Sequence, residues 1–109
     1  MSDPRELACV FKALSVDTRV KIVQLLKGGA LCVNSLAARL NVSPAAVSQH
    51  LRVMRDADLV VPDKRGYFVH YRLNEQTLAR WTVLTQGLLS LHPPRPSIVI
   101  DPKWPGGGR

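Results

Sequence analysis

Residues 43–56 read SPAAVSQHLRVMRD, and the fold that the sequence predicts depends mainly on this stretch. Ser43 is a favourable N-cap, because its hydroxyl can accept a hydrogen bond from a free backbone N–H of the first turn. Pro44 suits the first helical position, where no N–H is needed. These signals predict a helix that begins at Pro44 and runs to about Asp56.

At about 100° per residue, this helix has two unlike faces. The apolar face carries Val47, Leu51 and Met54, with His50 at its edge. The opposite face carries Ala45, Ser48, Gln49 and Arg52, with Arg55 nearby. Small residues let a helix enter a DNA major groove, glutamine can pair with adenine, and arginine can bind guanine or phosphate. An ordinary solvated face would look similar, so the neighbouring elements must decide between the two interpretations.

The upstream residues predict three helices. Leu7, Val10, Phe11 and Leu14 form an apolar stripe with helical spacing. A second helix follows Asp17-Thr18, a candidate N-cap, and ends at Gly28-Gly29. A short third helix covers residues 33–40, and Asn41-Val42 breaks it just before Ser43. Two short helices joined by a tight turn predict a helix-turn-helix, with Ser43 and Pro44 among the candidate DNA contacts.

The downstream residues predict a hairpin and a last helix. Residues 59–63 and 67–73 are short extended runs, and residues 63–66 between them read as a turn. Asn74 can cap a helix over about residues 75–91. The order α-α-α-α-β-β-α, mainly α with a small β-hairpin, is that of a winged helix-turn-helix. Lys64 and Arg65 then lie at the hairpin tip as candidate contacts to phosphates or the minor groove, although charged turns are common.

The last predicted helix is unusually apolar for the end of a small domain. Its stripe contains Leu78, Trp81, Leu84 and Leu88. This is more apolar surface than one small core readily hides, so these four residues are candidate dimerisation contacts. The sequence therefore predicts a homodimer.

Composition limits the class of protein. The 109 residues, 46% of them hydrophobic, suit one compact domain over residues 1–92. Residues 93–109 hold five of the eight prolines and a glycine run, which predicts a flexible tail. The net charge of +7 favours a polyanionic partner such as DNA. No apolar run approaches the roughly 20 residues of a membrane span, and no leader sequence is visible, so we expect a cytoplasmic protein.

The sequence offers no catalytic constellation. Three histidines and eight acidic residues are scattered, and no glycine-rich loop has phosphate-binding spacing, so we do not expect an enzyme. His50 and His70 lack metal-ligand spacing. His50 is instead a candidate DNA contact that bridges the core and a phosphate, whereas His70 lies on a predicted strand among aromatic residues, where packing is the simpler role. Two cysteines are too few for a disulfide framework.

From about residue 5 to residue 91 the chain resembles the ArsR/SmtB family of arsenic repressors. The resemblance rests on LCVNSLAARL (31–40), SPAAVSQHLRVMRDADLV (43–60) and the wing KRGYFVHYRL (64–73). It implies a winged-helix homodimer joined by its first and last helices. It also implies a transcription repressor that binds a palindromic operator and is released by an inducer. A winged helix used for protein–protein contact, or as an architectural module without an inducer, is the alternative.

The departures from this family concern the inducer. Arsenic and cadmium sensors often carry Cys-Val-Cys-Asp-Leu where this chain has Cys32-Val33-Asn34-Ser35-Leu36, so only Cys32 remains as a metal-ligand candidate. The last helix offers only Glu75 as a ligand, so a zinc site is not expected there. Cys9 and Cys32 are candidate thiol sensors, for arsenite or another thiophilic ion or for oxidation, because related repressors can bring such cysteines together across the dimer. The alternative is that both are small packing residues.

Overall fold

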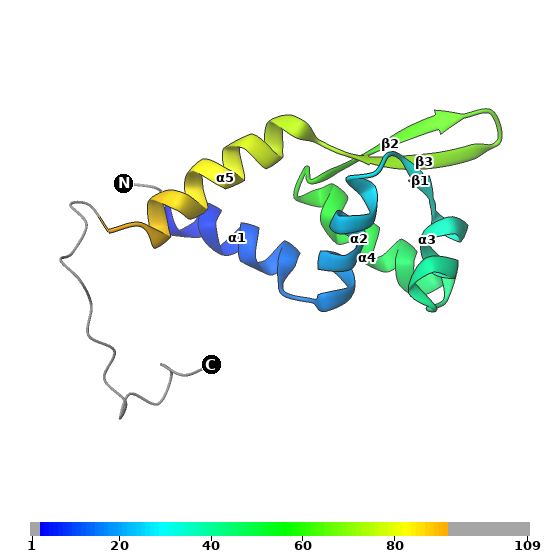
Figure 1. The fold of residues 1–109 in the computed structure, drawn as a ribbon, viewed down its shortest axis with the longest axis horizontal. Coiled ribbons are helices and arrows are strands. Elements are labelled where there is room, and N and C mark those ends of the chain that lie inside the picture. Colours follow the sequence, from blue (N-terminus) through cyan, green and yellow to red (C-terminus); the bar gives the residue numbers. More distant parts are fainter. Residues whose placement is uncertain (1–2, 92–109) are drawn as a thin grey trace, which may run out of the picture.

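The computed structural model describes residues 3–91, which form five helices and a small antiparallel sheet (Figure 1). Residues 1–2 and 92–109, including the predicted tail, lie outside the described residues. In chain order the elements are α1 (Pro4–Leu14), α2 (Asp17–Leu26), β1 (Leu31–Cys32), α3 (Val33–Leu40), α4 (Pro44–Asp56), β2 (Val60–Arg65), β3 (Phe68–Leu73) and α5 (Glu75–Leu89). The predicted winged helix-turn-helix order is confirmed, with β1 as an added strand.

Side-chain caps fix where three of these helices begin. The Asp3 carboxylate accepts a hydrogen bond from the Arg5 backbone N–H at 2.9 Å, and α1 follows with a proline at its start. Ser43 Oγ accepts from the Ala46 N–H at 3.1 Å at the start of α4, as predicted. Asn74 Oδ1 accepts from two backbone N–H groups at the start of α5. Each cap satisfies donors that an isolated helix would leave free.

The predicted N-cap of α2 is wrong. The cap residue is Val16, which makes no side-chain capping bond, and the helix already begins at Asp17. The backbone carbonyl of Val16 accepts from the Arg19 N–H at 2.9 Å, because the chain turns directly out of α1 after Ser15. Asp17 therefore stabilises the first turn by its charge near the positive end of the helix dipole.

The turn between α3 and α4 depends on Asn41. Its φ of 56° is left-handed, a conformation that asparagine tolerates better than most residues. Its N–H and that of Val42 donate to the carbonyls of Ala38 and Ala37, which closes the end of α3. The chain can then reverse within three residues and place α4 against α3.

The sheet has the order β1-β3-β2, with both pairs antiparallel. β1 is the strand that the sequence prediction lacks, because two residues give no readable periodicity. Cys32 on β1 and Asp63 on β2 both pair with His70 on β3. The hairpin is thereby fastened at its base to the start of α3.

The hairpin turn lies two residues later than predicted. Arg65 pairs with Phe68, so Gly66 and Tyr67 alone form the turn. Gly66 adopts a left-handed φ of 64°, which a tight two-residue turn requires and glycine provides without strain. Lys64 and Arg65 consequently belong to the end of β2 rather than to the tip.

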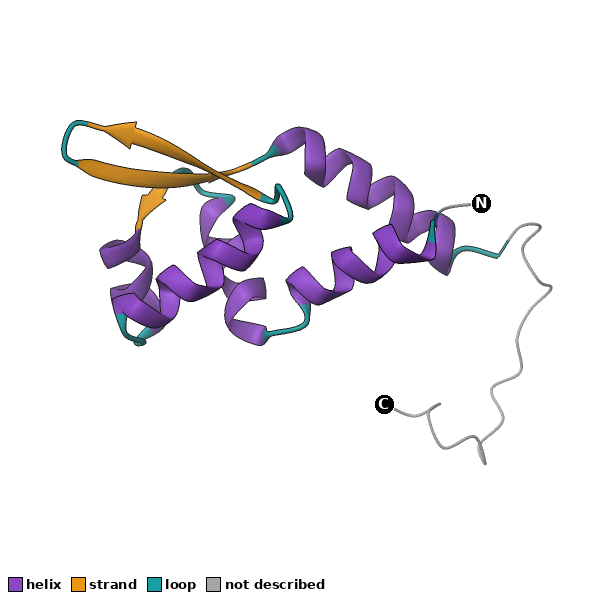
Figure 2. Ribbon diagram, turned by 180° about the vertical axis from the view of Figure 1, so that it is seen from behind, coloured by secondary structure: helices purple, strands orange, loops and turns teal. Residues whose placement is uncertain are grey.

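One main core joins α2, α3, α4 and the sheet. Its fully buried side chains include Ile22, Leu36, Val47, Leu51, Met54 and Leu59. A second, smaller cluster of Leu7, Val10 and Leu84 holds α1 against α5. Figure 2 shows these two helices side by side at one end, with the hairpin projecting at the other. Among residues 3–91, no helix combines the length and the apolar character that a membrane crossing requires.

Candidate nucleic-acid interface

The two faces of α4 differ as the sequence predicts. Val47, Leu51 and Met54 are almost wholly buried in the main core. Ser48, Gln49 and Arg52 are exposed, as are Ala45 and Arg55. The apolar face fixes the helix to the body of the protein, so the hydroxyl, amide and guanidinium groups are presented outward on a rigid support.

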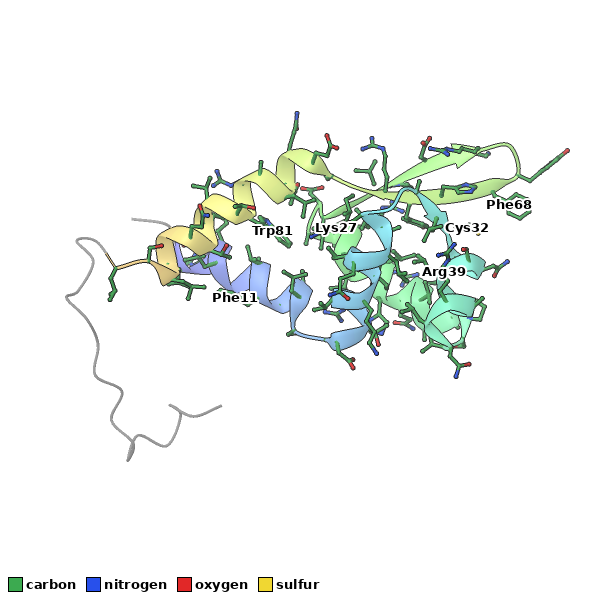
Figure 3. The ribbon with its side chains drawn as sticks, viewed as in Figure 1. Phe11, Lys27, Cys32, Arg39, Phe68 and Trp81 are labelled. Atoms are coloured by element: carbon green, nitrogen blue, oxygen red, sulfur yellow. The ribbon has the colours of Figure 1, made fainter. Side chains whose placement is uncertain are left out.

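α3 supports α4 from behind. Leu36 and Ala37 are buried in the same cluster as the inner face of α4. Arg39 lies exposed on α3 (Figure 3), and its Nε donates to Ser35 Oγ at 3.3 Å. Arg39 is a further cation in the helix-turn-helix that no sequence signal distinguishes, because arginines on short helices are common.

His50 is held by a residue that the sequence did not indicate. Arg19 on α2 donates from Nε to His50 Nδ1 at 3.2 Å and from Nη1 to the carbonyl of Lys12 at 2.9 Å. The guanidinium therefore links the end of α1 to α4. Since Nδ1 accepts this bond, the proton of the neutral imidazole lies on Nε2, the nitrogen left to donate elsewhere. No sequence pattern connects positions 31 residues apart, so only the fold reveals this link.

A groove of about 470 Å³ separates α4 from the wing. Its lining consists of Ser48, Leu51, Arg52, Arg55, Asp56 and Tyr71. Two guanidinium groups against one carboxylate make the groove basic. The polar face of α4 and Tyr71 of β3 thus border the same groove.

The wing presents Lys64, Arg65 and Tyr67 to solvent. Arg65 makes an ion pair with Asp63 on its own strand, with Nη2 and Oδ2 3.3 Å apart. Tyr67 occupies the turn and is fully exposed. The sequence predicts the turn two residues too early, which puts the two cations at the tip and leaves Tyr67 in a strand.

The two cysteines are free and belong to different parts of the fold. Cys9 is exposed on α1 beside a hollow of about 270 Å³ that Val53 and Asp56 of α4 and the following residue Ala57 also line. Cys32 is half-buried and is the N-cap residue of α3. Its cross-strand neighbour His70 has a buried Nδ1 without a hydrogen-bond partner. Residues 3–91 contain no group of three His, Cys, Asp or Glu side chains that could hold a metal ion.

At the α1–α5 end, the four predicted dimer contacts differ in how far their own chain buries them. Leu84 is buried against Leu7 and Val10 of its own chain, and Leu78 and Trp81 pack partly on the main core. Of the four predicted residues, only Leu88 is exposed, at 50%. Helical spacing placed all four on one stripe, but α1 already covers the inner part of it. The exposed apolar side chains at this end are instead Phe11, Val83, Leu88, Leu89 and Leu91.

One ion pair also joins these two helices. Arg80 on α5 donates to the Glu6 carboxylate from Nε at 2.5 Å and from Nη2 at 2.6 Å. The hydrogen-bonded guanidinium holds the pKa of Glu6 below its ordinary value, and the carboxylate raises the pKa of Arg80. The pair is exposed, so it orients α1 and α5 more than it stabilises them.

Comparison with known proteins agrees with this architecture. The sequence profile of the bacterial regulatory proteins of the arsR family matches residues 17–61, which span α2 to the start of β2. The transcriptional repressor SdpR of Bacillus subtilis is 39% identical over 69 residues, covering 63% of this chain and 77% of SdpR. The arsenical resistance operon repressor of Escherichia coli is 42% identical over 66 residues, covering 60% of this chain and 56% of that repressor.

A solved structure extends the likeness to the fold. The ArsR-like transcriptional regulator from Rhodococcus sp. RHA1 superposes with a TM-score of 0.70 at 34% identity, covering 77% of this chain and 79% of that chain. The superposition, the profile match and the identity to SdpR all indicate the same group of regulators. The chain belongs to the ArsR family of bacterial regulatory proteins.

Proposed function

We propose that this protein is a transcription repressor that binds duplex DNA as a homodimer and reads it with α4. The single observation that carries the proposal is the division of α4 into a buried apolar face and an exposed face of Ala45, Ser48, Gln49 and Arg52. Membership of a family of regulatory proteins supports the same role and agrees with the expectation that the chain is not an enzyme. A repressor of this kind would act in the cytoplasm, where bacterial DNA lies.

In this proposal, α4 lies in the major groove. Gln49 is suited to the adenine edge and Arg52 to guanine, since each can make two hydrogen bonds to one base. Ser43, Pro44 and the exposed N-terminal turn approach the phosphates, and His50 can donate from Nε2 while Arg19 holds Nδ1. Arg55, Lys64 and Arg65 add cations for the backbone on either side.

The dimer would form at the α1–α5 end. The exposed apolar side chains there are Phe11, Val83, Leu88, Leu89 and Leu91. A second copy of the chain would remove them from water. A two-fold dimer places two α4 helices on one face, which suits a palindromic operator with half-sites about one helical turn apart.

The test of DNA reading uses a duplex selected from a random pool by the full-length chain. We expect Gln49→Ala and Arg52→Ala each to weaken binding to it by about 1–3 kcal/mol, since each removes a bidentate base contact. Gln24→Ala and Arg5→Ala are matched controls, because they remove the same groups from exposed positions outside this face. Gel shifts at fixed salt measure the affinities. Unchanged affinity for both α4 variants would refute the proposal.

For the inducer, we propose that it acts through a thiol. Within residues 3–91 of one chain there is no group of three metal-ligating side chains, and Cys32 lies at the start of α3 with Asn34 and Ser35 beside it. An arsenite-like ion would need thiols from both chains, such as Cys9 of one and Cys32 of the other. The relative from Escherichia coli is named for arsenical resistance, which supports testing this class of inducer.

The thiol proposal predicts that Cys32→Ser keeps full DNA affinity but no longer releases DNA when arsenite or hydrogen peroxide is added. Cys9→Ser shows whether the second thiol participates. If the wild-type complex is stable to both reagents, the thiol proposal is wrong, and a winged-helix module without an inducer is the better description. Neither result bears on DNA reading by α4, which the gel shifts test separately.

A further inference from the structure

The tip of the wing exposes apolar side chains that the fold does not use. Tyr67 is fully exposed, and the neighbouring Phe68 and Val69 are 59% and 39% exposed. Most other exposed apolar side chains gather on α1 and α5 at the opposite end, and Figure 3 shows Phe68 far from Phe11 and Trp81. The proposed dimer contact therefore cannot cover the tip. An exposed apolar cluster on a projecting hairpin usually marks a contact with a partner.

The geometry of the turn makes Tyr67 a single projecting ring. The turn contains only Gly66 and Tyr67, and glycine adds no side chain. The Arg65–Phe68 pair closes the ladder directly behind it. A single side chain can enter a cleft that is too narrow for a helix, as the apolar wedges of minor-groove binders do.

Charge identifies the kind of partner. Lys64 and Arg65 are exposed beside the tip, and Asp63 is the only acidic residue between positions 60 and 73. The ion pair at 3.3 Å offsets only one of these two cations. An apolar ring flanked by cations fits the minor groove of DNA, which has apolar sugar walls between two rows of phosphates and is about 6 Å wide.

The tip also continues the surface of α4. Tyr71 on β3 lines the groove beside Ser48, Arg52 and Arg55. Because side chains alternate along a strand, Val69 lies on the same face of β3 as Tyr71, one step closer to the tip. A duplex whose major groove holds α4 would therefore pass next along the wing.

We propose that Tyr67 enters the minor groove beside the half-site that α4 reads, while Lys64 and Arg65 hold the flanking phosphates. The inference rests on the proposed DNA-binding function and adds a second reading residue to it. The ring packs against the sugar walls, and its hydroxyl reaches the acceptors on the groove floor. A·T pairs are then favoured at this position, because the 2-amino group of guanine occupies the same floor.

The experiment compares two duplexes that differ only in the minor groove. The first contains the half-sites selected by the full-length chain, flanked by A·T pairs. In the second, 2,6-diaminopurine replaces the flanking adenines, which adds an amino group to the minor groove and leaves the major groove unchanged. We expect the modified flanks to weaken wild-type binding about tenfold, the scale of one aromatic contact with a base step. Tyr67→Ala should bind the first duplex about tenfold more weakly than wild type and discriminate the two duplexes by less than about twofold.

The controls separate this inference from the proposed function. Tyr67→Phe keeps the ring, so it should retain most of the affinity and lose part of the discrimination. If the wild type does not distinguish the selected duplex from an unrelated one, the proposed function fails and the inference fails with it. If the wild type is specific but Tyr67→Ala binds and discriminates like the wild type, the inference alone is wrong. A Tyr67→Ala variant that dissociates into monomers, with its DNA contacts intact, would also overturn it.

Discussion

The two ends of the molecule bury their apolar residues to very different extents. At the helix-turn-helix end, the inner face of α4 is closed by α2, α3 and the sheet, and only polar or small side chains of that helix face outward. At the α1–α5 end, Leu7, Val10 and Leu84 are the buried cluster, while Leu88 and Leu89 remain 50% and 75% exposed. The first end is complete in one chain, whereas the second lacks a partner.

This difference shows how exposure can be interpreted. Exposed polar groups above a complete core are positioned for a polar ligand such as DNA. Exposed apolar groups above an incomplete core indicate a missing protein surface. The two ends should consequently respond differently to substitution, and protein concentration should matter at only one of them.

The largest effect is expected for the core beneath α4. Leu51→Ala should lower the free energy of unfolding by about 2–5 kcal/mol, because it leaves a cavity at a 2% exposed position. The loss should be the same at every protein concentration, since this core lies within one chain. Urea unfolding followed by circular dichroism measures it, with Val20→Ala, on the exposed side of α2, as control. A loss below about 1 kcal/mol would mean that the core beneath α4 is not completed within one chain.

A smaller effect on folding, but a large one on assembly, is expected at the α1–α5 end. Leu88→Glu with Leu89→Glu should raise the dimer dissociation constant by roughly 30-fold or more, because burying a leucine contributes about 1.5–3 kcal/mol. Sedimentation equilibrium measures the constant. Gln76→Glu, exposed in the first turn of α5, adds charge away from the leucines and should leave the constant unchanged. An unchanged constant in the double variant would place the dimer contact elsewhere.

The smallest effect is expected for the ion pair between Glu6 and Arg80. Because Arg80 lowers the pKa of Glu6, the pair contributes stability above the ordinary glutamate pKa and loses it as the pH falls through the lowered value. Glu6→Gln should therefore lower the Tm slightly at neutral pH and low salt, and the difference should vanish in acid. Thermal unfolding at several pH values tests this. A difference that persists below the pKa of Glu6 would show that the pair is not its cause.

Much of the helix-turn-helix could be predicted from the sequence, because its signals are local. Ser43 and Pro44 fix the start of α4, and Asn41 ends α3 with a left-handed backbone. The two faces of α4 follow from helical spacing alone. For these residues, the local signal and the tertiary contacts favour the same structure.

What could not be predicted depends on contacts between distant residues. Pairing of Cys32 with His70 creates β1, although two residues carry no periodicity of their own. The sequence predicts the hairpin turn two residues before its position at Gly66, because the charged residues 63–65 resemble turn residues until the strand register is known. Leu84 packs inward only because α1 folds back on α5. The link between Arg19 and His50 joins two helices whose approach no local pattern records.

The most direct test of the central claim is sedimentation velocity with the fluorescent selected duplex, using wild type and Arg52→Ala. DNA reading belongs to one end of the chain and dimerisation to the other in this proposal. We therefore expect one duplex with two wild-type chains, and an Arg52→Ala protein that remains a dimer but leaves the duplex free at the same concentration. One chain per duplex, or a complex with Arg52→Ala of unchanged affinity, would contradict it.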